Sequence, residues 1–278
     1  MTGPRPLPGP PDAGSVPGAP PAVPLSVVPL SAPPADSSTS APVESPSSSP
    51  RQRWRLYLRL PAVHVPGELP AGAGAWASLL ERSGLPLAGE PGRGRAVPAA
   101  QLPLGIAGER EIVDVVLAAR LPAAEVRERV RAGLPPLVEL VDLHDVWVGA
   151  PSASAALAAA DYRVEVAGVS PLGLRVAAEA LLAVATLPRQ RRREKKTQTF
   201  DLRPLIVSLS VAAVLPPAGA GADAPTAILR TRLRHRPDAV GRPEDVVSAL
   251  AEPPAPPLDG EVRVLRIVRE RLLTRDDA

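Results

Sequence analysis

The chain has 278 residues and a formal net charge of +3, and it contains 38 prolines and no cysteine. The lack of cysteine excludes disulfides, thiolate metal sites, iron–sulfur ligation and a cysteine nucleophile within this sequence. Only three histidines occur, His64, His144 and His235, and they are far apart, so we expect neither a metal site nor a cofactor. No apolar run approaches the roughly 20 residues of a membrane span and no secretory signal is recognisable, so we expect a cytoplasmic protein without membrane contact.

Residues 1–50 are rich in proline, alanine, serine and glycine and contain no aromatic residue. Ordering a chain costs about 1–2 kcal/mol per residue, and a segment with so few large apolar side chains cannot offset that cost by burial. We therefore predict a disordered tail over residues 1–50.

Residues 51–150 follow a strand and helix pattern. In residues 53–60, Trp54, Leu56 and Leu58 alternate with arginines and Tyr57, which predicts a half-buried strand. Helix signals follow at residues 75–83 and from Pro122 to Gly133, where proline suits a first helical position. The remaining strands are expected at residues 96–104, 112–118 and 137–148. The predicted order is β-α-β-β-α-β.

The same order recurs over residues 160–271. Strands are predicted at 162–166, 205–214, 228–236 and 262–268, and helices begin at Ser170-Pro171 and at Pro243, where acids occupy the first turn. We therefore predict an α+β protein with two ferredoxin-like βαββαβ halves, joined near residues 149–160. Each half is expected to form an antiparallel sheet with helices on one face only.

A basic loop is predicted at residues 189–203. Six basic residues fall within eight positions, and the two lysines are the only ones in the chain. They are Arg189, Arg191, Arg192, Arg193, Lys195 and Lys196. Phosphate contacts are electrostatic and independent of sequence, so this loop suits a polyanion, although a plain solvated loop remains open. Asp201 and Arg203 are two residues apart and are expected to hold the loop by an ion pair.

A second basic set lies on the strand at residues 228–236. A period of two places four arginines on one face, and these are Arg230, Arg232, Arg234 and Arg236. One interpretation is a phosphate or RNA contact surface on the helix-free face, shared with the basic loop. The other is a solvated face whose arginines pair with acids on neighbouring strands. Arg53, Arg55, Tyr57 and Arg59 would extend this face.

No catalytic constellation can be assigned. Asp142, His144 and Asp145 form a loose triad that could ligate a metal, but a polar strand edge explains them more simply. No phosphate-binding glycine loop or nucleophile elbow is present. The catalytic residues are therefore unknown.

The segment after the basic loop resembles the bacterial radical-SAM-linked protein family, whose members are encoded beside, or fused to, a radical-SAM enzyme. The matching residues are Lys195, Lys196, Thr197, Thr199, Asp201, Arg203 and Pro204. Weaker matches fall in order at residues 85–88, 102–105, 113–115, 161–164 and 242–246, so the resemblance covers roughly residues 53–270. The family usually carries Ser-His-Leu-Asp after the first strand, where this chain keeps only His64.

The resemblance implies an accessory protein that works with a radical-SAM enzyme encoded nearby and does no chemistry of its own. The basic loop would contact RNA or another polyanion. The alternatives are an RNA-modifying or RNA-processing enzyme on a tandem ferredoxin-like scaffold, and a scaffold that binds only protein. An enzyme would need a general acid or base, and His64, His144, Asp201 or a lysine would have to serve.

Overall fold

The computed structural model describes residues 51–90, 93, 95–193, 196–214, 226–236 and 239–277, with the backbone alone at Arg192, Arg193 and Lys196. The predicted tail and Lys195 lie outside these residues. Nothing in the described part is a helix long and apolar enough to span a membrane.

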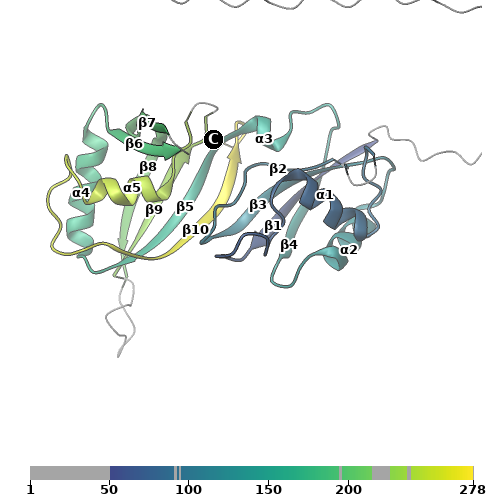
Figure 1. Ribbon diagram of the computed structural model, residues 1–278, viewed down its shortest axis with the longest axis horizontal. Coiled ribbons are helices and arrows are strands. Elements are labelled where there is room, and N and C mark those ends of the chain that lie inside the picture. The colour runs from purple at the N-terminus through teal and green to yellow at the C-terminus, as the bar shows by residue number, and fades with distance from the viewer. Residues whose placement is uncertain are drawn as a thin grey trace, which may run out of the picture. The chain divides into compact units, whose positions relative to one another are not determined.

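The chain is of mixed α+β type, as its sequence predicts (Figure 1). The first half consists of β1 (Gln52–Leu60), α1 (Gly72–Arg82), β2 (Ala96–Pro98), β3 (Ile106–Leu117), α2 (Ala123–Gly133) and β4 (Glu139–Val146). A short helix, α3 (Ala153–Ala156), leads into the second half. That half consists of β5 (Leu157–Ala167), α4 (Pro171–Ala183), β6 (Pro188–Arg193), β7 (Lys196–Asp201), the 3-10 turn η1 (Arg203–Leu205), β8 (Ile206–Ala213), β9 (Ala227–Arg234), α5 (Pro243–Leu250) and β10 (Arg263–Thr274).

The strands of both halves form one sheet, where the sequence predicts two. Its order is β4-β1-β3-β10-β5-β9-β8, with β2 also paired to β3. The two halves join where Ile267–Arg269 of β10 pairs in parallel with Ile106–Gly108 of β3. This pairing is available because β2 covers only residues 113–115 of that β3 edge, which leaves the start of β3 open.

Each half buries its helices against one side of the sheet. In the first half, Trp76 and Leu80 of α1 and Val126 of α2 pack with Trp54 and Leu56 of β1. A second cluster contains Leu174 and Leu181 of α4, Val246 and Leu250 of α5, and Leu229 and Leu233 of β9. Figure 1 shows α1 and α2 beside β1 to β4, and α4 and α5 beside β5, β8 and β9.

The predicted basic loop is an ordered hairpin for most of its length. Strands β6 and β7 pair antiparallel from Pro188 with Asp201 to Arg193 with Lys196, and they form a sheet of their own. Leu187 and Leu202, at the base of the hairpin, are buried in the cluster that holds α4 and α5. The hairpin therefore lies on the helix-covered side of the main sheet.

Candidate functional site

The arginines of β9 belong to a ladder of alternating charges. Arg232 makes two hydrogen bonds to the Asp161 carboxylate on β5, of 2.7 and 3.1 Å, and Arg271 of β10 binds the same carboxylate at 2.7 Å. Arg230 lies 3.7 Å from Glu270. Burial opposes the ionisation of Asp161, but the hydrogen bonds from Arg232 and Arg271 outweigh it and hold its pKa below the ordinary value. Cross-strand acids thus pair with Arg230 and Arg232, whereas Arg234 and Arg236 have no such partner among the described residues.

The base of the hairpin is attached to helix α5. Arg191 donates to the Asp245 carboxylate and to the Val240 carbonyl, and its guanidinium lies 4.6 Å from the centre of the Phe200 ring. Arg189 lies 3.8 Å from Glu252. These two arginines anchor the hairpin, while Thr197 and Thr199 of β7 are exposed.

Asp201 and Arg203 hold the strand that follows the hairpin, but not by the ion pair expected between their side chains. The Asp201 carboxylate accepts hydrogen bonds from the backbone N–H groups of Leu187 and Arg203, at 2.7 and 3.0 Å. The Arg203 guanidinium donates instead to the carbonyls of Leu182 and Ile206. Pro204 follows within η1 and is exposed.

The described side chains of the two basic sets do not share one surface. Arg189 and Arg191 contact α5, on the helix-covered side of the sheet. Arg230 and Arg232 alternate with the buried Leu229, Thr231 and Leu233, so they point to the opposite side. Consecutive residues of a strand point to opposite faces, so Arg189 and Arg191 do not face one ligand together with Arg230 and Arg232. The side chains of the other basic residues of the hairpin lie outside the described part of the chain, and for them the expectation stays a prediction.

The Asp142, His144 and Asp145 set forms a polar strand edge. His144 Nε2 lies 2.9 Å from Asp142, whose carboxylate also faces Arg110 at 3.5 Å. Asp145 accepts a hydrogen bond from Gln52. No group of three or more potential metal ligands occurs in the part of the chain that the structure describes.

A polar pocket lies where the two halves meet. Its volume is about 420 Å³, and it receives side chains from the first half, from β5, from the hairpin, from the end of β9, from α5 and from β10. The polar ones are Gln101, Tyr162, Arg191, His235, Arg242, Glu244 and Arg269. Pockets of about 300–1,000 Å³ with a few convergent polar groups are the usual form of small-molecule sites. This pocket is therefore the candidate functional site.

A buried ion pair forms one wall of the pocket. Arg269 of β10 makes two hydrogen bonds to Glu111 of β3, of 2.7 and 2.5 Å, and each side chain is only 4 % exposed. Glu111 does not line this pocket but a second one of about 290 Å³, which is mainly apolar and includes Trp76 and Leu102. Burying charges is costly unless they are paired, and such arrangements concentrate at functional sites.

Burial and the charge of Arg269 shift the pKa values of two groups in the pocket. Burial lowers the pKa of His235 below its ordinary value, and the charge of Arg269 lowers it further. Burial also raises the pKa of Tyr162, which opposes the influence of Arg269. Among the described residues, the side chains of Arg242 and Glu244 have no hydrogen-bond or ion-pair partner. His235 and Tyr162 line this pocket but were not predicted as site residues from the sequence. The candidate general acids or bases His64, His144 and Asp201 do not line it.

The depressed pKa of His235 predicts a pH dependence of stability. The pKa of His235 is lower in the folded chain than in the unfolded chain, so the unfolded chain binds a proton at this residue more readily. The contribution of neutral His235 to the free energy of unfolding is therefore complete above pH about 6.5, and it is lost as the pH drops through the folded pKa. We expect His235→Gln to weaken the dependence of the free energy of unfolding on pH in this range. The measurement is urea unfolding at several pH values between pH 5 and pH 8. His144→Gln is the matched control, and an unchanged slope in the His235 variant would contradict the prediction.

Comparison with known proteins identifies the family of this chain. No curated protein matches the chain. Residues 82–240, which include Tyr162, Arg191 and His235 of the pocket, match DUF2344, described as an uncharacterized protein conserved in bacteria. This match covers more than half of the sequence, and the chain therefore belongs to that uncharacterised bacterial family.

Proposed function

We propose that this protein is a non-enzymatic accessory protein of a radical-SAM enzyme in the cytoplasm, and that its hairpin contacts RNA. The partnership with a radical-SAM enzyme is supported by the resemblance around residues 195–204. The absence of cysteine from the sequence agrees with it, because the iron–sulfur cluster of such an enzyme needs thiolate ligands, which the partner would supply.

The observation that carries the RNA contact is the position of the basic residues along the hairpin. Arg189 and Arg191 lie at its base, where they pair with Glu252, just after α5, and with Asp245 of α5. Arg193 and Lys196 form the last backbone pair of the ladder. In the sequence, four of the five residues from Arg192 to Lys196 are basic. Four basic residues in five sequence positions concentrate positive charge, which suits an electrostatic contact with phosphates.

The ferredoxin-like architecture is part of the proposal. In the first half the strands pair antiparallel in the order β4-β1-β3-β2, and in the second half in the order β10-β5-β9-β8. Counted within each half, both orders are 4-1-3-2, and both halves place helices between strands 1 and 2 and between strands 3 and 4. The hairpin is then an insertion between α4 and β8 of the second half.

Replacing Lys195 and Lys196 together by alanine is expected to weaken RNA binding and to flatten its dependence on salt. Each phosphate contact releases condensed counterions, so losing two contacts lowers the slope of log K against log salt by roughly one to two units. The measurement is fluorescence anisotropy of a labelled single-stranded RNA at several salt concentrations, with the full chain.

The matched control removes the same charge from the first half. Arg127 and Arg131 lie on α2 and have no ion-pair partner among the described residues, so R127A/R131A should leave the slope unchanged. Equal losses in both double variants would show that net charge alone attracts RNA. An unchanged affinity in K195A/K196A would remove the hairpin from the interface.

A further inference from the structure

The apolar pocket in the first half is larger than the close packing of a protein core would leave. It is the pocket of about 290 Å³ that Glu111 lines, and it lies between residues 63–72, the start of α1, residues 98–104 and β3. Protein interiors are packed as tightly as organic crystals and hold few voids larger than a water molecule. Because an apolar cavity of about 150 Å³ already binds benzene, this pocket has room for a molecule of about 10–15 non-hydrogen atoms.

The two segments that border the apolar pocket are restricted in conformation and linked to each other. The backbone N–H of Gly105 donates to the Val63 carbonyl at 2.8 Å, which joins the end of the second segment to the start of the first. Each segment also contributes two prolines, whose rings fix the backbone angle φ, and these are Pro66, Pro70, Pro98 and Pro103. Such walls resist collapse into the empty space, so the pocket is largely formed before a ligand arrives.

The lining of the apolar pocket offers no free charge. Among the described residues that line it, only Gln101, Trp76 and Glu111 carry polar side-chain groups. Both carboxylate oxygens of Glu111 already accept hydrogen bonds from Arg269. A charged ligand would therefore lose its hydration in this pocket without gaining a counter-ion, which is costly. The charges of the lining favour a neutral ligand.

Exposed apolar side chains extend the surface of the pocket to the solvent. Val65 is 57 % exposed and Leu104 is 52 % exposed, and each comes from one of the two bordering segments. Apolar surface that is exposed at a concave site is typical of ligand-binding grooves. Water finds few hydrogen-bond partners there, so an apolar group that displaces it gains affinity.

We infer that the apolar pocket binds a neutral, mainly apolar small molecule with the size of two aromatic rings. The rings would contact Trp76 of α1 and Leu102, which line the pocket from two sides of the first half. Volume, restricted walls and uncharged lining all agree with this class of ligand. No residue of the hairpin lines the pocket, so the inference does not depend on the proposed function.

The first test is isothermal titration of the full chain with 2-acetylnaphthalene and with 2-naphthoate. The two probes share the naphthalene rings and have the same number of non-hydrogen atoms, but only naphthoate is charged. We expect the neutral ketone to bind about tenfold or more tightly than the carboxylate, because the pocket offers no counter-ion.

Leu102→Gln tests the location of the site. Leu102 and Leu121 are both half-buried and pack against the same hydrophobic cluster, but only Leu102 lines the pocket. Leu102→Gln changes the volume little and places an amide in the pocket, so it should weaken the binding of 2-acetylnaphthalene about tenfold. Leu121→Gln is the matched control and should leave this binding within about twofold of the unchanged protein. Thermal unfolding of both variants shows whether they remain folded.

A photochemical label locates the site in the unchanged protein and does not depend on how the variants fold. Benzophenone is a neutral ketone with two aromatic rings, and under ultraviolet light it attaches to C–H bonds beside it. Peptide mass spectrometry should find the label within residues 60–76 or 98–113, which contain the lining residues. Excess 2-acetylnaphthalene should reduce this labelling.

Four results would overturn the inference. They are no binding of 2-acetylnaphthalene, equal binding of the ketone and the carboxylate, equal losses in Leu102→Gln and Leu121→Gln, and labelling confined to residues outside 60–113.

Discussion

Glu111→Ala is expected to lower the free energy of unfolding by about 3–5 kcal/mol, because it leaves the Arg269 guanidinium buried without its counter-ion. Both side chains are 4 % exposed, so water cannot replace the lost carboxylate. The pair also lies beside the parallel contact between β3 and β10 that joins the two halves. Urea unfolding followed by circular dichroism measures the loss.

An exposed pair in the same sheet serves as the control. Arg59 and Glu139 are 2.7 Å apart, but their side chains are 55 and 60 % exposed, so Arg59→Ala should cost less than about 1 kcal/mol. The double variant E111L/R269M removes both charges and should be much closer to the unchanged protein than either single variant. If Glu111→Ala costs no more than Arg59→Ala, the pair does not support the joint between the halves.

The cost of the pair bears on function because Arg269 also lines the polar pocket. A buried pair that could be replaced by apolar residues is retained at an energetic disadvantage, which favours a role beyond stability. In this chain the pair fixes a guanidinium at the place where both halves contribute to one cavity. E111L/R269M should therefore retain the fold while removing the guanidinium group from the wall of the candidate site.

Alternation within a single strand makes many elements predictable. Trp54, Leu56 and Leu58 of β1 face the core, and Leu229 and Leu233 of β9 do the same, as the period of two requires. The helix starts at Pro171 and Pro243 follow from local capping and proline geometry. These features depend on neighbours in the sequence, so one chain suffices to locate them.

The junction between the halves depends on contacts that no local pattern records. Register shifts between Val264 and Arg266 and between Arg269 and Arg271 break the alternation of β10, so its inward-facing Arg269 cannot be recognised from spacing. The predicted strand also ended at residue 268, whereas β10 continues to Thr274. The sequence pattern therefore predicted a separate sheet for each half and not the single sheet that joins them.

The candidate site was missed for a related reason. Its residues Gln101, Tyr162, His235 and Arg269 are distant in sequence and carry no shared motif. The basic run on the hairpin gave the stronger local signal. Of its described side chains, Arg189 and Arg191 anchor the base of the hairpin by contacts with Glu252 and Asp245. Charge runs locate basic segments, but they do not show which face of a sheet the segments reach.

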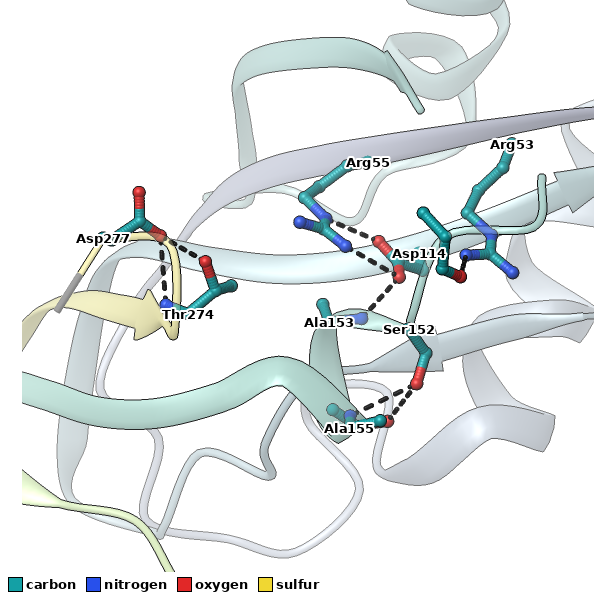
Figure 2. A network of polar contacts seen from close by, with 10 residues as sticks. Arg53, Arg55, Asp114, Ser152, Ala153, Ala155, Thr274 and Asp277 are labelled. Atoms are coloured by element: carbon teal, nitrogen blue, oxygen red, sulfur yellow. Dashed lines mark hydrogen bonds and ion pairs between the residues drawn. The ribbon is translucent and has the colours of Figure 1, made fainter. Parts of the chain in front are cut away.

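Asp114→Ala is expected to lower the free energy of unfolding by about 3 kcal/mol or more and to loosen the segment between the halves. The Asp114 carboxylate is 4 % exposed and accepts hydrogen bonds from Arg55 at 2.8 and 3.2 Å and from the backbone N–H of Ala153 at 2.7 Å. Figure 2 shows Arg55 on one side of this carboxylate and the start of α3 on the other. Its removal leaves Arg55, which is 14 % exposed, and a buried N–H group without an acceptor.

Two readouts separate this role from a general loss of packing. Urea unfolding gives the stability change, and hydrogen exchange followed by mass spectrometry should show faster exchange at residues 149–156 than in β1 or β5. Asp145→Ala is the matched control, because that carboxylate is exposed and accepts a single hydrogen bond from Gln52, so it should cost less than about 1 kcal/mol. The nearby bond from Arg53 to the Ala150 carbonyl, also drawn in Figure 2, remains in both variants and keeps part of the segment attached. Unchanged exchange at residues 149–156 in Asp114→Ala would mean that Asp114 stabilises the sheet without holding the connection between its halves.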